Sequence, residues 1–380
     1  MGISRRILLR RLAAGAVAGA AARSLGGIAL AEAPAAARVG SAADPILLYR
    51  NENAYGPSEK VLAAMRECCL SGNRYARTEY DVLVSKIAAL HRVKPEQIVL
   101  GCGSGEILRA TADTFLGAGK KLVEAAPTFP ALGKLAQAGG SEVVDVPLGK
   151  NYEHDLDTML ARAGATTNLV YICNPNNPTG TVTPRKDIEE FLRKLPGKAM
   201  VLIDEAYHHF VTGASDYTSF LDRPVDDGRV IVARTFSKIY GLAGMRVGYA
   251  VATPEIAKRL AADHLPFAIS IVAARAAAAA LDDVEYVKMG VKRNATDRQQ
   301  FLDQARARNL RPIDSHTNFA MVDAMRPPQE IIDHLKKNNI LIGPIYPAMD
   351  KYIRVSLGTP ADMQEFWRVW DLMPPQKMAM

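Results

Sequence analysis

The stretch Thr235-Phe236-Ser237-Lys238-Ile239-Tyr240-Gly241-Leu242-Ala243-Gly244-Met245-Arg246 is the part of the chain on which the interpretation of the rest depends. The run Val230-Ile231-Val232-Ala233, which consists mostly of β-formers, precedes it, and Val247-Gly248-Tyr249-Ala250-Val251 follows it. Hydrophobic runs on both sides of a glycine-containing segment predict a strand, a loop and a second strand. The sequence therefore places Lys238 in a loop between two buried strands.

Lys238 and its neighbours have the chemistry to bind a phosphorylated aldehyde. A lysine amine can form a Schiff base with a carbonyl compound, and the planar guanidinium of Arg246 suits a phosphate. Thr235 and Ser237 add hydroxyl donors, so the combination suggests pyridoxal phosphate (PLP), an aldehyde that acts as an electron sink. The stretch alone is equally compatible with a simple turn that carries an exposed lysine and a structural arginine.

Length and composition indicate a globular enzyme. The chain has 380 residues, of which 48% are hydrophobic and 23% are charged, and this length allows a large domain and a smaller one. The net charge is +7, but five arginines among residues 1–31, which hold no acidic residue, leave only +2 for the remainder. We therefore expect no nucleic-acid partner. The cysteines lack metal-site spacing, so we expect thiols and no metal at Cys68, Cys69, Cys102 and Cys173.

The first residues resemble a twin-arginine export signal. Ser4-Arg5-Arg6-Ile7-Leu8-Leu9-Arg10 is followed by a weakly hydrophobic Ala/Gly/Leu run over residues 12–30, and Ala29-Leu30-Ala31 offers a small-x-small cleavage site. We expect a signal peptide over residues 1–31 and a linker over residues 32–44. The alternative is a disordered or membrane-lying N-terminus.

An export signal of this type implies that the protein crosses the membrane already folded, which suits a protein that folds around a cytoplasmic cofactor. We expect a periplasmic location, with membrane contact only during export, and a cytoplasmic location if the leader is not functional. Arg23-Ser24 interrupts the apolar run, which is rich in Ala and Gly, so it does not predict a permanent transmembrane helix.

Strand patterns and helix patterns alternate from about residue 97 to residue 204. Such alternation predicts an α/β fold with a mostly parallel sheet that helices cover on both faces. After Pro254 the pattern changes to helices and then to short strands between helices, which predicts a small α+β domain. We place an N-terminal arm at residues 45–57, the large domain at 58–265 and the small C-terminal domain at 266–380.

Ligands of open α/β sheets bind beyond the carboxyl ends of the strands. Polar and aromatic side chains follow the predicted strands at these ends, namely Ser104, Phe129, Asn177, Asp204, Tyr207 and Lys238. We therefore expect these side chains to gather in one site.

Asn177, Asp204, Tyr207, Lys238 and Arg246, in this order, resemble the site of the fold-type I PLP-dependent aminotransferases of class I/II. The chain is most similar to the histidinol-phosphate aminotransferase branch. Further matching pieces span essentially all of the chain after its leader, namely residues 51–56, 73–75, 101–106, 127–129, 174–180, 204–207, 235–248 and 354–359. The resemblance implies an aspartate-aminotransferase-like fold, with a large PLP-binding domain, a mostly parallel seven-stranded sheet and a small α+β domain.

By this resemblance, the catalytic residues are Lys238, Asp204 and Tyr207. Lys238 carries the cofactor as a Schiff base and later moves a proton at the substrate Cα. Asp204 pairs with the pyridine nitrogen and keeps it protonated, which makes the ring an electron sink. Tyr207 and Asn177 donate hydrogen bonds to the phenolic oxygen of the ring.

The other implied cofactor contacts surround the ring and the phosphate. Phe129 stacks on the ring face, although a Phe after Pro-Thr is by itself more often a core residue. Backbone N–H groups of Ser104 and Gly105 lie at a helix N-terminus, which favours a phosphate. The phosphate site is completed by Thr235, Ser237 and Arg246.

Three further residues are implied to bind from farther away. Tyr75 resembles a tyrosine that reaches the phosphate from the partner subunit, which implies a homodimer, although alone it is also compatible with an exposed loop. Arg354 resembles the arginine that binds the substrate α-carboxylate, although it is also compatible with a surface charge at a strand end. Tyr55 resembles a residue that closes over the substrate, which Asn177 also contacts.

Gly343-Pro344 stands where the family typically has an arginine that helps to bind the substrate phosphate. This difference and the export signal argue against histidinol phosphate as the substrate. We expect PLP-dependent transamination between an L-amino acid and a 2-oxo acid. The alternatives are histidinol-phosphate transamination itself, and a decarboxylase or lyase of the same fold. A non-enzymatic binding protein is less expected because both Lys238 and Asp204 are present.

Overall fold

The computed structural model describes residues 39–262 and 267–374, and these described residues belong to one compact unit. The predicted signal peptide, and the predicted linker up to residue 38, lie outside the described residues. Within the described ranges, the helices are too short or too polar to span a bilayer.

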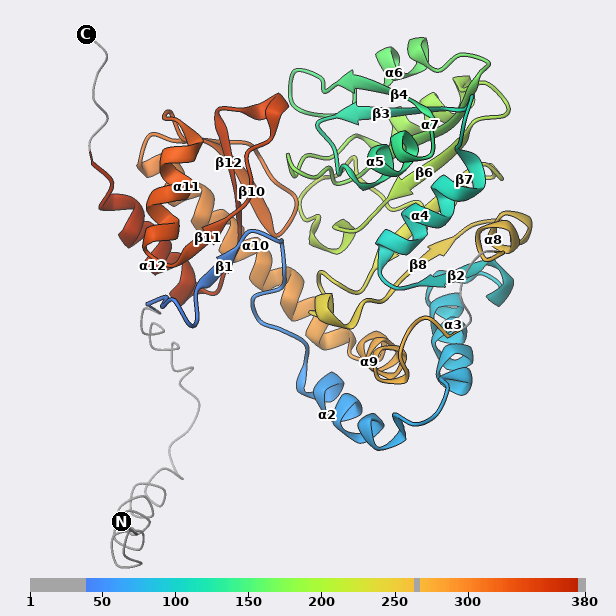
Figure 1. Ribbon diagram of the computed structural model, residues 1–380, viewed down its shortest axis with the longest axis horizontal. Helices are drawn as coiled ribbons and strands as arrows, with labels where there is room; N and C mark the ends of the chain where they lie inside the picture. Colours follow the sequence, from blue (N-terminus) through green and yellow to red (C-terminus); the bar gives the residue numbers. More distant parts are fainter. Residues whose placement is uncertain (1–38, 263–266, 375–380) are drawn as a thin grey trace, which may run out of the picture. The chain divides into compact units, whose positions relative to one another are not determined.

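The large sheet has seven strands in the order β2-β8-β7-β6-β5-β3-β4 (Figure 1). β3, β4, β5, β6 and β7 run parallel to one another, whereas β8 lies antiparallel between β2 and β7. The mostly parallel seven-stranded sheet is therefore confirmed. The bounds are β2 (Ile98–Gly101), β3 (Lys121–Ala126), β4 (Glu142–Pro147), β5 (Thr167–Cys173), β6 (Met200–Asp204), β7 (Val230–Thr235) and β8 (Gly248–Val251).

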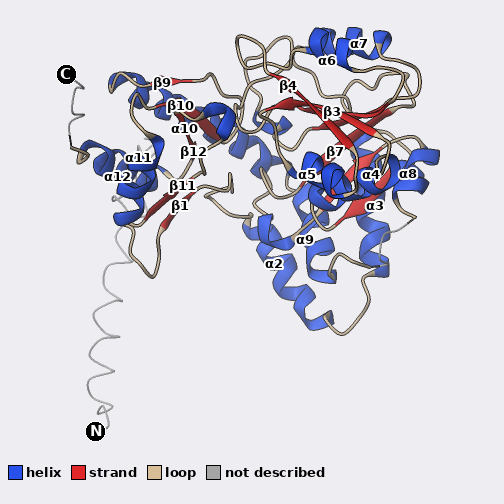
Figure 2. Cartoon of the chain, turned by 45° about the horizontal axis from the view of Figure 1, so that its top comes forward, coloured by secondary structure: helices blue, strands red, loops and turns tan. Residues whose placement is uncertain are grey.

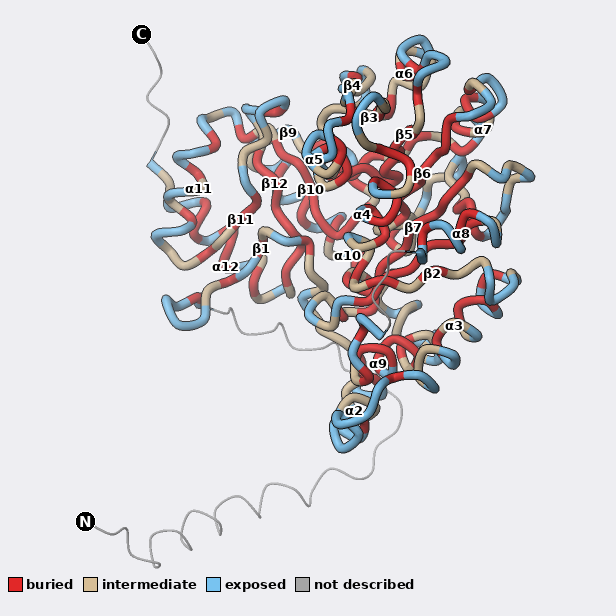
Figure 3. Tube along the Cα trace, turned by 45° about the vertical axis from the view of Figure 1, so that its right-hand side comes forward, coloured by how far each residue is buried: buried red, intermediate tan, exposed pale blue. Residues whose placement is uncertain are grey.

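Helices cover both faces of this sheet, as Figure 2 shows in blue around the red strands. Because the central strands are buried on both sides, they are almost continuously apolar, and every residue of β6 and β7 is buried (Figure 3). One face carries α4 (Ser104–Phe115), α5 (Ala131–Ala138) and α8 (Pro254–Leu260). The other carries α2 (Glu59–Cys68), α3 (Arg77–His91), α6 (Leu156–Arg162), α7 (Arg185–Lys194) and α9 (Ile271–Leu281).

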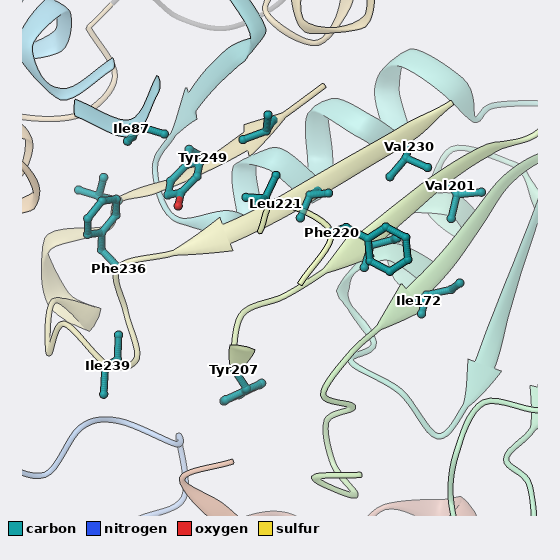
Figure 4. Close-up of a cluster of buried hydrophobic side chains, with 14 of the residues drawn as sticks. Ile87, Ile172, Val201, Tyr207, Phe220, Leu221, Val230, Phe236, Ile239 and Tyr249 are labelled. Atoms are coloured by element: carbon teal, nitrogen blue, oxygen red, sulfur yellow. The ribbon is translucent and has the colours of Figure 1, made fainter. Parts of the chain in front are cut away.

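Figure 4 shows part of the core on the second face. Ile172 of β5, Val201 of β6 and Tyr249 of β8 belong to the same cluster as Ile87 of α3 and Phe236, which follows β7. The loop that carries Lys238 thus begins with a side chain anchored in this core.

The C-terminal part of the chain builds two smaller sheets with their own core. β10 (Phe319–Asp323) pairs antiparallel with β9 (Arg311–Pro312) and β12 (Tyr352–Ser356), while β11 (Ile340–Ile342) pairs in parallel with β1 (Ile46–Leu48) of the predicted arm. Aromatic side chains of α10 and α12 fill the core beside them. The helices are α10 (Val284–Ala307), α11 (Pro328–Lys337) and α12 (Pro360–Asp371).

Most predicted elements are present, with small differences at their ends. Ser58 caps α2, because its side chain accepts a hydrogen bond from Val61 N at 3.3 Å. α3 begins at Arg77, two residues after Tyr75. α9 packs against α2 and α3, although it lies after residue 265, and the domain boundary at that position stays a prediction.

Candidate active site

A pocket opens at the carboxyl ends of the central strands, where the site was expected. It brings together every predicted cofactor residue except Tyr75, together with several residues that were not predicted. The lining consists of Arg50, Glu52, Ser104, Gly105, Phe129, Ala131, Cys173, Asn177, Asp204, Ala206, Tyr207, Thr235, Ser237, Lys238, Ala243, Gly244 and Arg246.

Lys238 lies in the loop after β7, and its amine is held by the arm. Nζ donates hydrogen bonds to the carbonyl oxygens of Arg50 at 3.1 Å and Asn51 at 2.9 Å. Phe236 and Ile239 on either side are almost fully buried, which fixes the loop. Burial, and then the nearby charge of Arg354, lower the pKa of Lys238 to about 8. An appreciable fraction of this amine is therefore neutral, and hence nucleophilic, near neutral pH.

Asp204 ends β6 at the floor of the pocket and is 3% exposed. Its Oδ1 accepts a hydrogen bond from Ala206 N at 3.1 Å, and its Oδ2 accepts one from the Tyr171 hydroxyl at 3.0 Å. Burial raises the pKa of Asp204 to about 6, while these two hydrogen bonds act in the opposite direction. A carboxylate held in this way is suited to pair with a protonated ring nitrogen.

The opposite end of the pocket is built for an anion. α4 begins at Ser104, so its unpaired N–H groups lie beside the pocket. Arg246 has a left-handed backbone with φ 56°, and its Nη1 donates to Ser237 Oγ at 3.3 Å and Ala243 O at 3.1 Å. A Cβ at Gly103, whose φ is 76°, would overlap the Arg246 guanidinium. This close approach of helix start, guanidinium and hydroxyls fits the phosphate of PLP.

Arg354 of β12 lies close to the pocket and is 6% exposed. Nη1 donates to Asn177 Oδ1 and Nη2 donates to Tyr49 O, both at 2.7 Å, whereas Nε has no hydrogen-bond partner within the described part of the chain. The rings of Phe319 and Tyr346 lie 5.4 and 5.5 Å from its Cζ. A buried cation with a spare donor is suited to bind a carboxylate, and the predicted alternative of a surface charge is wrong.

Two predicted residues lie elsewhere. The Tyr55 hydroxyl donates to Asp297 Oδ2 of α10 at 2.9 Å, and the Arg293 guanidinium lies 4.1 Å over its ring. Tyr55 therefore lines a separate hollow between the arm and α10. Tyr75 is 85% exposed, and its ring centroid lies 5.7 Å from that of Phe267.

Sequence reasoning missed several residues of the site. Arg50 and Glu52 line the pocket, and Asn51 Nδ2 donates to the Tyr207 hydroxyl at 3.0 Å. The motif over residues 51–56 could have indicated that the arm lies over the pocket, but Arg50 stands outside it. Nothing in the sequence indicated that Tyr171 contacts the site, because a tyrosine inside an apolar strand is usually a core residue.

Residues 43–369 match the family described as aminotransferase class I and II. The chain belongs to this family. It is 36% identical over 327 residues to the histidinol-phosphate aminotransferase of Moorella thermoacetica, which covers 86% of this chain and 84% of that protein.

Two solved structures show how widely this fold is used. The histidinol-phosphate aminotransferase of Sinorhizobium meliloti, solved in complex with pyridoxal 5′-phosphate, superposes with a TM-score of 0.80 at 30% identity and covers 86% of this chain and 92% of that one. The L-threonine-O-3-phosphate decarboxylase of Porphyromonas gingivalis superposes with a TM-score of 0.74 at 21% identity and covers 86% and 98%. The second likeness shows the fold alone.

The aspartate-aminotransferase-like fold predicted from the sequence is therefore confirmed. The protein is a PLP-dependent aminotransferase, and pyridoxal 5′-phosphate is its cofactor.

Proposed function

We propose that the pocket transfers the amino group of an L-amino acid with a free α-carboxylate to a 2-oxo acid. PLP, when bound, supplies an electron sink for negative charge that develops at the substrate Cα. Lys238 binds the cofactor covalently and then moves a proton at that carbon through Nζ, which its lowered pKa favours. Asp204, already held by Tyr171 and Ala206, receives the ring nitrogen.

Tyr207 and Asn177 orient the ring, and Phe129 packs against its face. The Tyr207 hydroxyl accepts a hydrogen bond from Asn51, so its own proton remains available to donate to the phenolic oxygen of the cofactor. Burial raises the pKa of Tyr207 well above its usual range, which keeps this hydroxyl protonated. Ser104, Gly105, Thr235, Ser237 and Arg246 then bind the phosphate.

The choice of an amino acid with a free carboxylate as substrate rests on the burial of the Arg354 guanidinium beside the pocket. Its two 2.7 Å contacts hold the guanidinium beside Asn177, which lines the pocket, so the cation is placed to bind a carboxylate there with little change in position. Gly343, which follows β11, donates its N–H to Arg354 O at 2.9 Å. Glycine and proline at positions 343 and 344 bring no cation for a substrate phosphate.

Histidinol phosphate is the second candidate substrate, and the position of Arg50 in the pocket lining favours it. Its side chain lines the pocket, lies over the Tyr49 ring at 5.0 Å and carries a positive charge that could bind a distal anion. Arg326, which could also have replaced the missing cation, is engaged elsewhere, because its Nη2 donates to Pro374 O at 2.9 Å.

The test compares kcat/KM for a panel of L-amino acids with kcat/KM for histidinol phosphate, using 2-oxoglutarate and pyruvate as acceptors. We expect free amino acids to be preferred by about 10- to 100-fold, the effect of one missing charge-assisted hydrogen bond. Arg354→Ala should lower activity on all of them alike. Formation of the product amino acid without release of CO₂ identifies transamination rather than decarboxylation.

A preference for histidinol phosphate in the wild type would contradict this assignment. In that case Arg50→Ala should remove the preference, because Arg50 would be the residue that binds the phosphate. Arg326→Ala is the matched control, since its guanidinium is bound at the C-terminal end of the described chain.

We propose that the enzyme is a homodimer in which Tyr75 reaches the phosphate site of the partner. Supporting this, Leu70 and Tyr75 are 90% and 85% exposed, and Phe267 beside Tyr75 is 39% exposed, so an apolar surface is available for a second copy. Sedimentation should give twice the mass of the chain. Mixing Tyr75→Ala with Lys238→Ala subunits should restore activity through one intact site, and no recovery would count against a shared site.

We propose that the leader directs export by the twin-arginine route, which is supported by the order Ser-Arg-Arg-x followed by apolar residues at Ser4-Arg5-Arg6-Ile7-Leu8-Leu9. Replacing Arg5 and Arg6 by lysine should keep the protein in the cytoplasm. Unchanged periplasmic activity of this double variant would contradict the proposal, while its cytoplasmic activity shows that folding is intact.

A further inference from the structure

Tyr171 lies beneath the active-site pocket and binds the carboxylate that faces the cofactor. It is on β5, is 0% exposed, and donates its hydroxyl proton to Asp204 Oδ2 at 3.0 Å. β5 and β6 are neighbours in the sheet, and Tyr171 pairs in register with Leu202, two residues before Asp204. The hydroxyl of a tyrosine on the neighbouring strand thus reaches the carboxylate at the end of β6.

The two hydrogen bonds to Asp204 come from different sides and fix the plane of its carboxylate. Ala206 N holds Oδ1 from the chain that follows β6, and Tyr171 holds Oδ2 from the neighbouring strand. Burial, and then the charge of Asp204, raise the pKa of the Tyr171 hydroxyl well above its usual range. The hydroxyl thus stays protonated and acts as a donor to Asp204.

A second buried carboxyl group lies beside Tyr171, on the neighbouring strand β3. Glu124 of β3 lies opposite Tyr171 in register and is 5% exposed, and Gly133 of α5 leaves room for its carboxyl group. Burial, and then the charge of Asp145, raise the pKa of Glu124 to about 8. Near neutral pH Glu124 is therefore mostly neutral. The charged carboxylate to which the Tyr171 hydroxyl donates is that of Asp204.

We propose that Tyr171 is a positioning residue that orients the Asp204 carboxylate and keeps it ionised against the ring nitrogen of the cofactor. This inference rests on the proposed role of Asp204. Without the Tyr171 donor, Asp204 becomes more basic, because a hydrogen bond to the charged form is lost. The proton shared between Asp204 and the ring nitrogen then shifts toward the carboxylate, and the ring withdraws electrons less strongly.

The test is Tyr171→Phe in the full-length holoenzyme, which removes one oxygen atom and keeps the ring. We expect the ¹⁵N resonance of ¹⁵N-labelled PLP to move toward the value of an unprotonated pyridine. We also expect kcat to fall by about 5- to 50-fold, with KM for the amino acid changed by less than about 3-fold. An unchanged ¹⁵N resonance together with an unchanged kcat would overturn the proposal.

Tyr249→Phe is the matched control. Tyr249 is also a buried strand tyrosine, and its hydroxyl lies 2.8 Å from His91 Nε2, away from Asp204. We expect a similar loss of thermal stability in both variants, but a shifted ¹⁵N resonance only in Tyr171→Phe. If kcat falls in both variants and the resonance moves in neither, the role of Tyr171 is structural and the proposal is wrong.

A second variant covers the case in which Tyr171→Phe does not fold. Fluorotyrosine at position 171 keeps the size of the side chain and makes its hydroxyl a stronger donor, so the ¹⁵N resonance should move in the opposite direction, toward full protonation. No movement would overturn the proposal. A wild-type protein that binds no PLP would overturn the proposed function and this inference together, whereas a normal wild type with an unchanged variant overturns the inference alone.

Discussion

At the scale of single residues, the arm holds the reactive amine. The carbonyl groups that bind Lys238 belong to residues 188 and 187 positions earlier in the chain, and the resulting burial lowers its pKa to about 8. The same arm brings Asn51 against Tyr207 and presents Tyr49 O to Arg354. One short segment therefore organises the amine, the tyrosine and the carboxylate-binding guanidinium.

Lys238→Ala should abolish turnover, because it removes both the covalent attachment and the proton-transferring amine. The fold should be retained. In the apoprotein the folded-state pKa of Lys238 lies below its unfolded value of 10.5, so the free amine costs stability at pH 7, and the apo form of the variant should unfold at an equal or higher temperature than the apo wild type. Amino-acid turnover and thermal unfolding measure the two effects.

Lys134→Ala, at an exposed position on α5, is the control and should retain full activity. Substantial turnover by Lys238→Ala would contradict the role assigned to Lys238.

At the scale of elements, the turn between β2 and α4 is the part of the anion site that depends most on backbone geometry. Gly103 adopts φ 76°, which places the start of α4 and the Arg246 guanidinium next to each other with no room for a side chain. Gly105, two residues on, lies inside the helix, and a Cβ there would meet nothing within 4 Å.

Gly103→Ala should weaken PLP binding by about 10-fold or more, because a positive φ is unfavourable for alanine and the new methyl group would displace Arg246. Gly164→Ala, outside the pocket lining and with open space for a Cβ, is the control and should bind PLP normally. Equilibrium dialysis of the apoprotein against PLP measures both. Equal affinities in the two variants would show that Arg246 does not bind the phosphate.

At the scale of the whole molecule, buried histidines link stability to pH. Burial lowers the pKa of His91 to about 3 and, with the charge of Arg234, lowers the pKa values of His208 and His209 well below their usual range. Because the folded-state pKa is depressed, the stability that depends on a neutral histidine is fully present above pH 6.5 and is lost as the pH falls toward 3. Glu124 and Asp204, whose pKa values are raised, act in the opposite direction.

His91→Gln should isolate the acid sensitivity that comes from one histidine. Between pH 7.5 and pH 5.5 the free energy of unfolding of the wild type should fall by about 1.4 kcal/mol more than that of the variant. Glutamine can still hydrogen-bond to the Tyr249 hydroxyl, so the contact near His91 is conserved. Urea unfolding at the two pH values gives the difference, and parallel behaviour of both proteins would mean that folding does not lower the pKa of His91.

Strand and helix positions were predictable because the apolar period is a local property, and Val230-Ile231-Val232-Ala233 and residues 248–251 form the expected strands around the lysine loop. The packing of α3 against α9 was not predictable, because it joins residues about 190 positions apart in the chain. Helix boundaries depend on such contacts as well as on local signals.

The sequence by itself determined the family, the cofactor and the residue types of the site, since Asn177, Asp204, Lys238 and Arg246 belong to motifs read along the chain. Only the tertiary structure decided which atoms meet: that Arg354 contacts Asn177, 177 positions away, that Tyr171 binds Asp204, and that Tyr55 turns toward Asp297 instead of the pocket. The physical reason is that such contacts depend on strand register and side-chain direction across the sheets, which are fixed by burial of the whole core.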